Sequence, residues 1–582
     1  MAEQGQIDNR GAAGAFRRLA DLLEIRGESL YRVAAYRRAA ESFDRLAEPI
    51  TAVRARGELE DIPGVGTAIA RKVEDLLDSG SFDLLREVEA EIPPGVAALL
   101  SVPDIGPKRA RLLYRELGVE SLEDLREALD QGRLDPIPGL GAGAARRIAE
   151  GLNSLQATDE RLPLGVAHAR GLALIARLRE RAPGIRRIEL AGSVRRHRET
   201  VGDLDIAAAA DDPAAVVEAF ATLPEVANIE LRGPNRCRLV LVDGFPADLW
   251  VLPERHWGSL LFHLTGDKHH DIRVREMAVA RGGRLSEYGF SAGGDLTPFA
   301  EEEDVYAFFG LQPIPPPMRE DPAALDLAGR GALPEVLEVE HLRADLHLHT
   351  DWSDGKGTVR EMALAARARG YSYIAVTDHS RGLAVANGLG PERLREQRAE
   401  IDAVNAELAP FRVLQGIELE VRGDGRLDLD DDTLAALDLV VAAVHSGLRQ
   451  GRERVTERAL AAIRHPLVDV LAHPTGRIVG GRAGGDFDLV ALYAEAARTG
   501  TALEIDADPA RLDLRDVHAR AAVAAGCTLT VDSDAHVPGG LANASFGVGV
   551  AQRAWVPPDR VLNTLPLDAL LGRLKRNRSL PS

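Results

Sequence analysis

Cysteine, lysine and long apolar runs are all scarce in this 582-residue chain. Its two cysteines, Cys237 and Cys527, provide neither a framework of disulfide bonds nor a zinc site made of thiolates. No apolar run approaches the length that crosses a bilayer, and the N-terminal residues MAEQGQIDNR lack the charged-then-apolar pattern of a secretion signal. We therefore expect a protein of the reducing cytoplasm that has no membrane partner.

Positive charge is also in deficit, because 71 lysine and arginine residues face 90 aspartate and glutamate residues, for a net charge of −19. This balance argues against a protein that coats nucleic acid through bulk electrostatics, but it allows local contacts made by backbone amides and bound cations. Nearly all the basic residues are arginine, and the lysines are Lys72, Lys108, Lys268, Lys356 and Lys575. A lysine in such a chain is a candidate for a specific role.

What is present is a globular composition, with 45% hydrophobic and 28% charged residues, in a chain long enough for about three or four domains. Residues 1 to 155 have the pattern of short amphipathic helices, and residues 159–312 that of a mixed α/β region. From residue 341 strands and helices alternate, which indicates an α/β barrel. The proline-rich segment PIPPPMRE (313–320) predicts a stiff linker between them.

A glycine-turn pattern recurs in the helical region, as IPGVGTAIARKV (62–73), VPDIGPKRARLL (102–113) and IPGLGAGAARRIAEGL (137–152). In each copy an apolar residue and a glycine turn precede a helix rich in alanine and basic residues. Such a hairpin points the unpaired N–H groups of a helix N-terminus outward, where they suit a phosphate oxygen. Three copies resemble the helix-hairpin-helix element of DNA repair proteins, which contacts backbone phosphates without reading sequence. The predicted DNA-binding residues here are Gly64, Gly66, Gly106, Lys108, Gly139 and Gly141.

The segment GSVRRHRETVGDLD (192–205) carries the chemistry of the middle region. Gly192 and Ser193 follow a predicted strand and begin a turn into a helix, which suits phosphate, and Arg195 and Arg196 add guanidinium groups. Two carboxylates that are two residues apart on a strand point to one side, as Asp203 and Asp205 would. Asp248, on the second strand of a hairpin with a turn at 243–244, is a third carboxylate that would complete a two-metal site.

Nine metal-type side chains follow apolar strand runs in the C-terminal region. They are His347, His349, Asp354, His379, Glu418, His445, His473, Asp534 and His536. A barrel of parallel strands collects its functional groups at the C-terminal ends of the strands in this way. Any one histidine could be a core or surface residue, but the whole set indicates a hydrolase site with two or three metal ions.

Together these motifs carry a resemblance to a known family. GSVRRHRETVGDLD resembles the nucleotidyltransferase motif of family-X DNA polymerases, the polymerase beta group, and the nine-residue set resembles a PHP (polymerase and histidinol phosphatase) domain. In this order, over essentially the whole chain, they resemble the bacterial and archaeal family-X polymerases of the PolX type. The resemblance implies an all-α helix-hairpin-helix N-terminal region, an α/β nucleotidyltransferase palm with a thumb, and a C-terminal distorted (β/α)7 PHP barrel. The implied domains are a lyase-like DNA-binding domain (1–85), a fingers-type domain (86–158), the palm (159–252), the thumb (253–318), a linker (319–340) and the PHP domain (341–582).

The resemblance also implies roles for individual residues. Asp203, Asp205 and Asp248 would bind two catalytic Mg²⁺ or Mn²⁺ ions, and Arg275 would contact template DNA. The nucleotide-binding positions would be Gly192, Ser193, Arg196, Gly202, Thr265, Gly266 and Asp271, with Ser286, Glu287 and Tyr288 as further thumb elements facing the nucleotide.

Four positions depart from the family pattern. His263-Leu264 stands in place of an aromatic pair, Asp271 in place of an asparagine, Asp267 in place of a serine and Trp250 in place of an arginine. All four bear on nucleotide positioning and sugar discrimination, and none is a metal ligand. We therefore expect polymerisation, with fidelity and ribonucleotide rejection left open.

In the PHP region the match to the family's nine ligand positions is complete. The resemblance implies an active 3′–5′ exonuclease that uses two or three Mn²⁺ or Zn²⁺ ions, with abasic-site endonuclease and 3′-phosphatase activity as further options. Arg477 in HPTGR is either a phosphate contact or an ordinary surface arginine.

Lys72 matches the Schiff-base lysine of the polymerase beta lyase domain, a role that demands an amine rather than a guanidinium. Ala68, however, replaces a lysine that helps to bind a 5′-phosphate in the eukaryotic relatives, so an ordinary solvated or phosphate-contacting lysine is the alternative. Tyr36 and Arg37 match a face that binds the 5′ side of a gap, or else are a packing residue and its solvated neighbour.

These observations predict a monomeric, cytoplasmic, nucleoid-associated repair enzyme that binds gapped or primer–template DNA and dNTPs, fills short gaps and trims 3′ ends. One alternative is a small-molecule phosphatase of the histidinol-phosphatase type, which leaves Asp203, Asp205 and Asp248 without a role. The other is a non-catalytic DNA scaffold, against which two complete sets of ligands argue.

Overall fold

The protein is described by a computed structural model that covers residues 9–46, 48–102, 105–134, 136–137, 140–141, 143–146, 148–149 and 161–575. It divides into two compact units, Met1–Glu160 and Arg161–Ser582. No helix in these described ranges is long and apolar enough to span a membrane.

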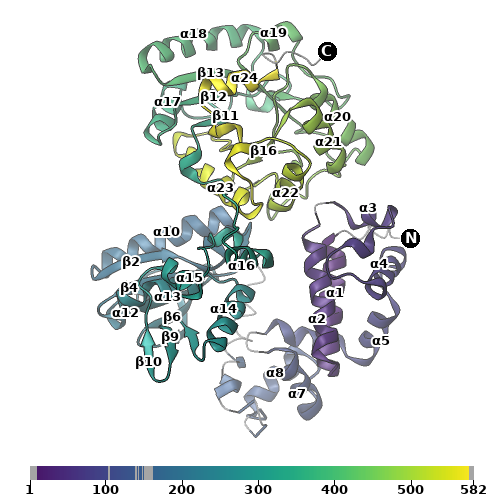
Figure 1. Cartoon of the computed structure of the whole chain (residues 1–582), viewed down its shortest axis with the longest axis vertical. Coiled ribbons are helices and arrows are strands. Elements are labelled where there is room, and N and C mark those ends of the chain that lie inside the picture. Colours follow the sequence, from purple (N-terminus) through teal and green to yellow (C-terminus); the bar gives the residue numbers. More distant parts are fainter. Residues whose placement is uncertain are drawn as a thin grey trace. The chain divides into compact units, whose positions relative to one another are not determined.

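The N-terminal unit is helical, as the sequence predicted (Figure 1). Its elements are α1 (Asn9–Arg26), α2 (Leu30–Asp44), α3 (Ile50–Ala55), η1 (Leu59–Asp61), α4 (Thr67–Ser79), α5 (Asp83–Glu91), α6 (Pro94–Ala98), η2 (Leu99–Ser101), α7 (Pro107–Leu117) and α8 (Leu122–Asp130). The ring of Phe16 on α1 lies 5.1 Å from that of Phe43 on α2 and 5.2 Å from that of Phe82 before α5. This aromatic cluster joins α1, α2 and the start of α5.

Two of the three predicted hairpins can be followed in this unit. Gly64 has φ +82°, which a residue with a side chain adopts only at a cost, and Gly66 caps α4. Gly106 caps α7 in the same way, and a Cβ added at Gly66 or Gly106 would meet no atom within 4 Å. The first turns of α4 and α7 are therefore open to a partner. Gly139 lies outside the described residues, whereas the carbonyl of Gly141 accepts a hydrogen bond from the Ala144 amide at 2.7 Å.

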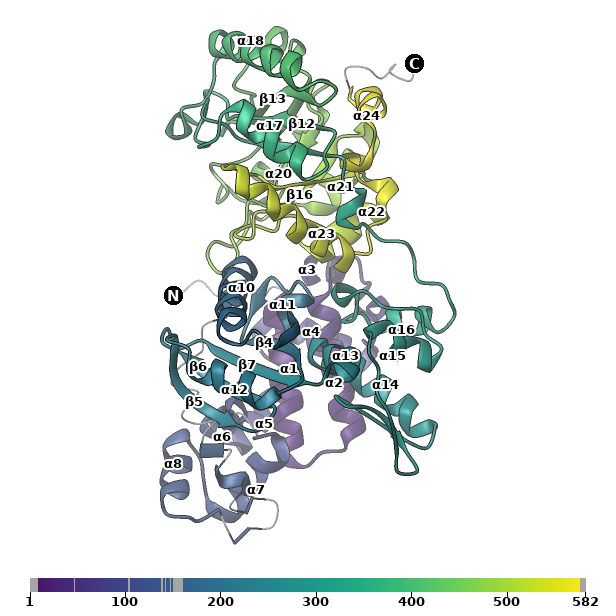
Figure 2. The same cartoon turned by 90° about the vertical axis from the view of Figure 1, so that its left-hand side faces the viewer.

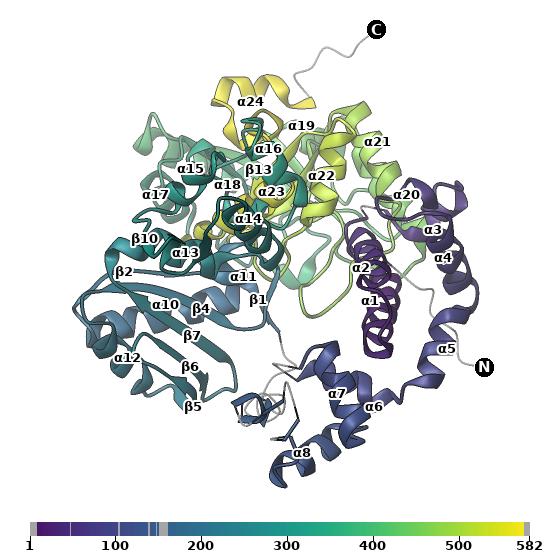
Figure 3. The ribbon, with the colours of Figure 1, turned by 60° about the horizontal axis from the view of Figure 1, so that its bottom comes forward.

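The palm region is built on a five-stranded sheet in the order β2 (Ile185–Leu190), β4 (Leu204–Ala210), β7 (Pro246–Leu252), β6 (Arg236–Leu241), β5 (Val226–Arg232) (Figure 3). Strands β4 and β7 run parallel, and β6 and β7 form the predicted hairpin, with Gly244 at φ +85°. Helices α10 (Leu164–Arg181) and α12 (Pro213–Ala221) pack on the sheet, as does α13 (Trp257–Thr265). Short strands β1 (Leu162–Pro163) and β3 (Thr200–Val201) pair beside it.

Alternation along β4 decides which face of the sheet holds the carboxylates. Ile206 and Ala208 belong to the core shared with α10, whereas Ala207 and Ala209 pack with Trp257 of α13. Because successive side chains of a strand point to opposite faces, residue 205 shares the α13 face with residues 207 and 209.

The thumb region follows, with η3 (Glu254–His256), α13, α14 (Lys268–Ala280), β8 (Arg284–Ser286), β9 (Gly289–Ala292), β10 (Asp295–Thr297) and α15 (Glu302–Phe309). The segment that we expected to be a stiff linker is instead part of its packed core. It forms η4 (Pro316–Met318) and leads into α16 (Pro322–Ala328), with Ile314 and Met318 buried beside Phe262 and Tyr306. The prolines predicted a stiff backbone, but the apolar residues between them pack against the thumb.

The C-terminal region is a nearly closed barrel of seven parallel strands (Figure 2). The strands follow chain order, as β11 (Ala344–Leu348), β12 (Tyr373–Val376), β13 (Arg412–Glu420), β14 (Leu439–Ala443), β15 (Val470–Leu471), β16 (Ala502–Asp506) and β17 (Leu529–Asp532). A parallel bridge between Leu348 and Ala535 joins the first strand to the segment after the last. The helices are α17 (Val359–Ala368), α18 (Pro391–Leu408), α19 (Asp431–Ala435), α20 (Arg452–Arg464), α21 (Leu489–Thr499), α22 (Asp516–Ala524), α23 (Ala544–Arg553) and α24 (Leu567–Arg573).

A half-buried histidine of the palm, His197, packs against α23 of the barrel. His197 has φ +51°, and a Cβ added at Gly549 would collide with its ring, so the glycine makes room for the imidazole. Burial, helped by His168 and Arg553, lowers the pKa of His197 to about 4. The charged imidazolium is therefore disfavoured in the folded protein.

We expect this histidine to make the fold less stable in acid. Between pH 6.5 and pH 4 the unfolded chain binds a proton at His197 that the folded chain rejects, so the free energy of unfolding falls as pH falls, by up to about 3 kcal/mol. Asparagine tolerates positive φ, so His197→Asn should retain the fold and lose this contribution. Thermal unfolding of wild type and His197→Asn between pH 5 and pH 7 measures this contribution. An equal pH dependence of the unfolding temperature in the two proteins would contradict the expectation.

Candidate active sites

The three palm carboxylates come together on adjacent strands. Asp205 on β4 and Asp248 on β7 are partners across the parallel pair, and Asp203 comes just before β4. Burial raises the pKa of Asp205 to about 8, and the carboxylates of Asp203 and Asp248 add to the rise. A buried carboxyl group whose ionisation is opposed by two neighbouring carboxylates fits a site that takes divalent cations.

Gly192 is required where the phosphate-binding turn meets this cluster. It has φ +55°, and a Cβ at this position would collide with the Asp205 carboxylate. The short helix α11 (Gly192–Arg195) starts here, and the Ala191 amide donates to the Asp205 carbonyl at 2.8 Å. The glycine therefore lets Ser193 and the α11 turn lie directly beside the metal-type carboxylates.

A hollow of about 480 Å³ joins most of the predicted nucleotide-binding residues to Asp203 and Asp205, whereas Asp248 is not among the residues that line it. It is lined by Gly192, Ser193, Arg196, Asp203, Asp205, His263, Leu264, Gly266, Lys268, Asp271, Ile272 and Arg275. Two predicted members do not line it: Thr265 is buried behind it, and Gly202 lies against Arg161. Three of the lining side chains are cationic, which suits a polyphosphate next to a metal site.

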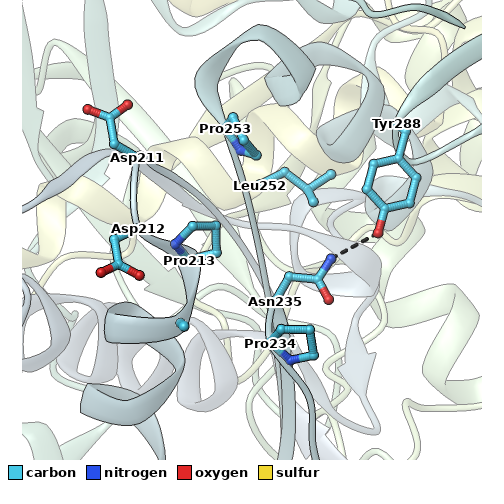
Figure 4. Close-up of a pocket in the computed structure, with 9 residues that line it drawn as sticks. Asp211, Asp212, Pro213, Pro234, Asn235, Leu252, Pro253 and Tyr288 are labelled. Carbon is cyan, nitrogen blue, oxygen red and sulfur yellow. Dashed lines mark hydrogen bonds between the residues drawn. The ribbon is translucent and has the colours of Figure 1, made fainter.

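A second hollow, of about 670 Å³, lies between the palm strands and the thumb (Figure 4). Its lining includes Asp211 and Asp212, and the amide of Asn235 donates to the Tyr288 hydroxyl there at 2.9 Å. It contains two carboxylates and no cationic side chain, so it does not suit a triphosphate. Tyr288, which we expected on the nucleotide side of the thumb, contacts the palm here instead of lining the hollow that contains Asp203 and Asp205.

Three of the positions that depart from the family pattern are neighbours in space. The rings of Trp250 and His263 lie 6.0 Å apart, and Arg275 donates to His263 Nδ1 at 2.8 Å. Asp271 Oδ2 lies 3.7 Å from the same nitrogen, and burial raises the pKa of Asp271. The fourth, Asp267, caps α14 by accepting a hydrogen bond from a backbone amide. Three of the departures thus form one connected cluster beside the hollow, and the fourth is a helix cap.

Arg236 is a palm residue that the sequence analysis missed. It stands opposite Trp250 across the β6–β7 ladder, donates to both Asp248 oxygens at 3.1 and 2.5 Å, and stacks 4.3 Å from the Trp250 ring. Arg195, expected to add a guanidinium for phosphate, is instead paired with Glu302 at 2.9 Å and donates to Thr265. The strand period would have placed residue 236 beside the carboxylates if the register of the hairpin had been known.

The barrel brings all nine of its predicted metal ligands together at the C-terminal ends of the strands. Ligand atoms within 4.8 Å of one another form three overlapping groups: His349, Asp354, His379 and His536; His347, His349 and Asp534; and His379, Glu418 and His445. His473 joins them through Glu418, with Nε2 2.9 Å from Oε1.

Several of these atoms are buried without a hydrogen bond among the described residues, namely His347 Nε2, His349 Nε2 and Glu418 Oε2. The two imidazole nitrogens each lie 3.6 Å from Glu418 Oε2. Buried polar atoms without partners are costly, and here they converge as a nitrogen and oxygen donor set. The residues therefore fit a cluster of divalent metal ions.

Two carboxylates that the sequence analysis missed orient these ligands. His347 Nδ1–H donates to Glu504 at 2.7 Å, and His445 Nδ1–H donates to Glu420 at 2.6 Å. The opposite ring nitrogen of each imidazole then faces the cluster. Strand position could have identified both residues from the sequence. Glu420 lies at the end of β13 and Glu504 near the end of β16, and the ligands gather at these strand ends.

Replacing Glu504 with glutamine is expected to weaken metal binding by about 10- to 100-fold, because the amide no longer fixes the tautomer of His347. Glu504 also accepts from the His473 amide at 2.6 Å, so two ligands lose orientation at once. Equilibrium dialysis against Mn²⁺ measures the change directly. Glu495→Gln, which alters a half-buried glutamate paired with Arg464 and Arg498 away from the metal ligands, is the matched control. Equal affinities in the two variants would contradict the expectation.

Arg477 does not face the metal cluster as a phosphate contact. It donates to Glu199 of the palm at 2.6 Å and to the carbonyls of Arg511 and Leu512 at 3.0 and 2.6 Å. That alternative was wrong because the guanidinium is occupied at the boundary between palm and barrel. The guanidinium near the ligands belongs to Arg511, whose Nε lies 3.7 Å from Asp534 Oδ2.

In the N-terminal unit, Lys72 lies half-buried on α4, with Nζ 3.0 Å from the Ala68 carbonyl and 6.0 Å from the Tyr36 ring centre. Tyr36 is buried, and Arg37 pairs with Asp21 and Glu24 at 2.9 and 2.8 Å. The packing alternative therefore describes Tyr36, whereas the chemical role of Lys72 remains a prediction. Lys108 is exposed on the first turn of α7.

Comparisons with known proteins agree with this architecture. The chain matches family models described as a helix-hairpin-helix domain (residues 7–82), a SAM-like helix-hairpin-helix tandem (96–154), the DNA polymerase beta thumb (260–320) and the PHP domain (345–506). It is 26% identical over 326 residues to DNA polymerase lambda of Rattus norvegicus, which covers 50% of this chain and 53% of that protein. It is 29% identical over 237 residues to a probable phosphatase of Shewanella oneidensis, which covers 39% of this chain and 89% of that protein.

A further relative spans both regions. The chain is 37% identical over 566 residues to the DNA polymerase/3′–5′ exonuclease PolX of Bacillus subtilis (strain 168), covering 96% of this chain and 98% of the relative. That likeness extends over nearly the whole length of both chains. The chain therefore belongs to the PolX family of DNA polymerase/3′–5′ exonucleases.

Proposed function

We propose that this protein is a DNA repair polymerase that fills short gaps by template-directed nucleotide addition and shortens 3′ ends in its barrel. The observation that carries the proposal is the presence of two separate clusters of metal-type side chains in one compact unit. One is the carboxylate trio beside a cationic hollow, and the other is the nine-residue cluster of the barrel.

At the palm, Asp203, Asp205 and Asp248 would hold two Mg²⁺ or Mn²⁺ ions. Such ions, when bound, stabilise charge on the attacking and leaving oxygens of a phosphoryl transfer. The α11 turn would place the Ser193 hydroxyl on the triphosphate, with Arg196 beside it. Asp271 and Arg275, on α14, line the same hollow and would face the base and the template.

At the barrel, the nine ligands would hold two or three Mn²⁺ or Zn²⁺ ions, which when bound activate water and polarise the phosphoryl group. Glu420 and Glu504 would keep His445 and His347 in the tautomer that presents Nε2 to the metal. Arg511, beside Asp534, would offset the negative charge of a phosphodiester that enters the site.

The N-terminal unit would hold the DNA through the open first turns of α4 and α7, with Gly64, Gly66, Gly106 and Lys108 at the phosphates. This mode of binding reads no sequence and suits gapped duplexes of any composition. Lys72 would add lyase activity on a 5′ sugar phosphate, a part of the proposal that rests on the resemblance alone.

A phosphatase acting on small molecules is the second candidate, favoured by the likeness of the barrel to probable phosphatases along most of their length. The deciding experiment gives the protein a one-nucleotide gap with a 5′-phosphate and, separately, p-nitrophenyl phosphate, both in Mn²⁺. Extension and 3′ shortening of the primer with little hydrolysis of the small ester support the polymerase. Rapid hydrolysis of the ester by a protein that leaves the primer unchanged supports the phosphatase.

A further inference from the structure

Arg196, one of the two arginines that line the hollow containing Asp203 and Asp205, is held by contacts outside that hollow. Arg196 Nη1 donates to the Thr265 carbonyl, and Arg196 Nε donates to Glu320 Oε1 at 2.9 Å. Among the described residues none accepts a hydrogen bond from Nη2, and the side chain lines the hollow with Asp203 and Asp205. The position of this guanidinium therefore depends on what holds Glu320.

Glu320 is shared by three arginines. Besides Arg196, Arg198 Nη1 donates to its Oε2 at 2.7 Å and Arg553 Nη2 donates to the same oxygen at 3.0 Å. Its side chain is only 16% exposed; burial alone would raise its pKa, but the three guanidinium groups lower the pKa to about 2. Glu320 thus remains a carboxylate at any working pH, and charge-assisted hydrogen bonds hold it.

Arg553, the last residue of α23, belongs to the barrel but reaches into the palm. Its side chain is 12% exposed, and each of its three nitrogens has a partner. Nε donates to Asp516 of α22 at 2.9 Å, Nη1 to the carbonyl of Arg196 at 3.2 Å, and Nη2 to Glu320. One guanidinium therefore contacts both the backbone of Arg196 and the carboxylate that binds the Arg196 side chain.

We propose that Arg553 is a positioning residue for nucleotide addition, a barrel residue that fixes the palm arginine Arg196 through Glu320. The inference rests on the proposed polymerase function. In this role Arg553 makes the barrel a structural part of the polymerase site, in addition to the barrel's own proposed activity. The planar fork of arginine suits this role, whereas a lysine ammonium is a point charge that cannot span the same three acceptors.

The expected consequence is a change in nucleotide affinity. Arg196 would bind the triphosphate in the ground state and the transition state alike, so its misplacement raises KM for dNTP more than it lowers kcat. Arg553→Met, which retains length and loses charge, should raise this KM by roughly 10-fold, the size typical of coupled neighbouring residues. Arg553→Lys should give a smaller rise.

Arg520→Met is the matched control. Arg520 donates to Asp321 at 2.7 Å and stacks 5.0 Å from the Trp555 ring, so it also joins the barrel to the segment after the thumb. Within the described part of the chain Arg520 contacts neither Arg196 nor Glu320, and it meets Arg553 at the backbone carbonyl, 3.4 Å from Nη2, and not at the guanidinium. Its variant loses an ion pair at the same boundary and should leave KM for dNTP within about 2-fold of wild type.

The experiment measures kcat and KM for dNTP on a one-nucleotide gap for wild type, the two Arg553 variants and Arg520→Met. It also compares Arg196→Ala with the Arg196→Ala/Arg553→Met double variant. If Arg553 acts through Arg196, the second change adds less than about 2-fold to KM in that background. An unchanged KM in Arg553→Met, an equal rise in Arg520→Met, or additive effects in the double variant would each overturn the proposal.

Loss of Arg553 removes an ion pair from the half-buried Asp516, which keeps only the Val517 amide at 2.9 Å and Arg515 at 3.7 Å, and so destabilises the fold. Glu320→Gln therefore tests the same chain of contacts from the palm side. Its carboxamide retains the shape and loses the charge, and it should raise KM for dNTP as Arg553→Met does. Mn²⁺-dependent 3′ shortening reports on folding in every variant. A wild-type protein that cannot extend the primer refutes the proposed function itself, whereas normal extension with an unchanged KM in Glu320→Gln refutes only the role of Arg553.

Discussion

Replacing Asp205 with asparagine is expected to lower the rate of nucleotide addition by roughly 1000-fold while 3′ shortening stays within about 2-fold of wild type. Asp205 stands opposite Asp248 across β4 and β7 and beside Asp203, so an amide there removes a shared ligand of both predicted ions. Single-turnover extension of a labelled primer in a one-nucleotide gap measures the loss.

Asp211→Asn provides the matched control for that variant. Asp211 directly follows the same strand, β4, and its carboxylate is paired with exposed Arg186 at 2.5 Å. The control should extend the primer at the wild-type rate. Extension by Asp205→Asn at more than about one-tenth of the wild-type rate would remove this carboxylate from the reaction.

Replacing Glu418 with glutamine is expected to lower the rate of 3′ shortening by roughly 1000-fold and leave nucleotide addition unchanged. Glu418 is buried at the centre of the cluster, with oxygens 2.6 Å from His379 Nδ1, 3.0 Å from His445 Nε2 and 2.9 Å from His473 Nε2. His379, His445 and His347 hold the pKa of Glu418 well below its usual range in spite of its burial, so the site is built around a carboxylate.

The readouts are shortening of a 5′-labelled strand in Mn²⁺ and the bound metal counted by elemental analysis. Glu407→Gln is the control, because Glu407 is a surface residue of the same barrel paired with Arg360 at 2.6 Å. Both variants should unfold at similar temperatures. Wild-type shortening in Glu418→Gln, or a loss that the control shares, would contradict a metal role for this residue.

The barrel ligands could be predicted from sequence because strand ends of a parallel barrel converge whatever lies between them. His347 and His349 are two apart at the end of β11, and Glu418 lies on β13, so the strand period places all three at the same mouth. The same two-residue spacing predicted that the palm carboxylates Asp203 and Asp205 point to one side. Both sites therefore depend on local patterns that a single sequence displays.

Contacts between distant segments could not be predicted in this way. Arg196 and Glu320 are separated by 124 positions, and Glu320 and Arg553 by 233. No period or motif relates such residues, because their proximity is decided by how whole domains pack. The prediction that Arg477 contacts phosphate was wrong for the same reason. Its local sequence suited phosphate, but Glu199, 278 positions away, accepts its hydrogen bond.

The central claim is that one chain contains two separable active sites, and one gel tests it. A 5′-labelled primer in a one-nucleotide gap is incubated in Mn²⁺ with and without dNTPs, using wild type, Asp205→Asn, Glu418→Gln and the double variant. Two separable sites predict extension without shortening in Glu418→Gln, shortening without extension in Asp205→Asn, and neither product in the double variant. Loss of both products in either single variant, whose unfolding temperature matches that of wild type, would contradict the claim.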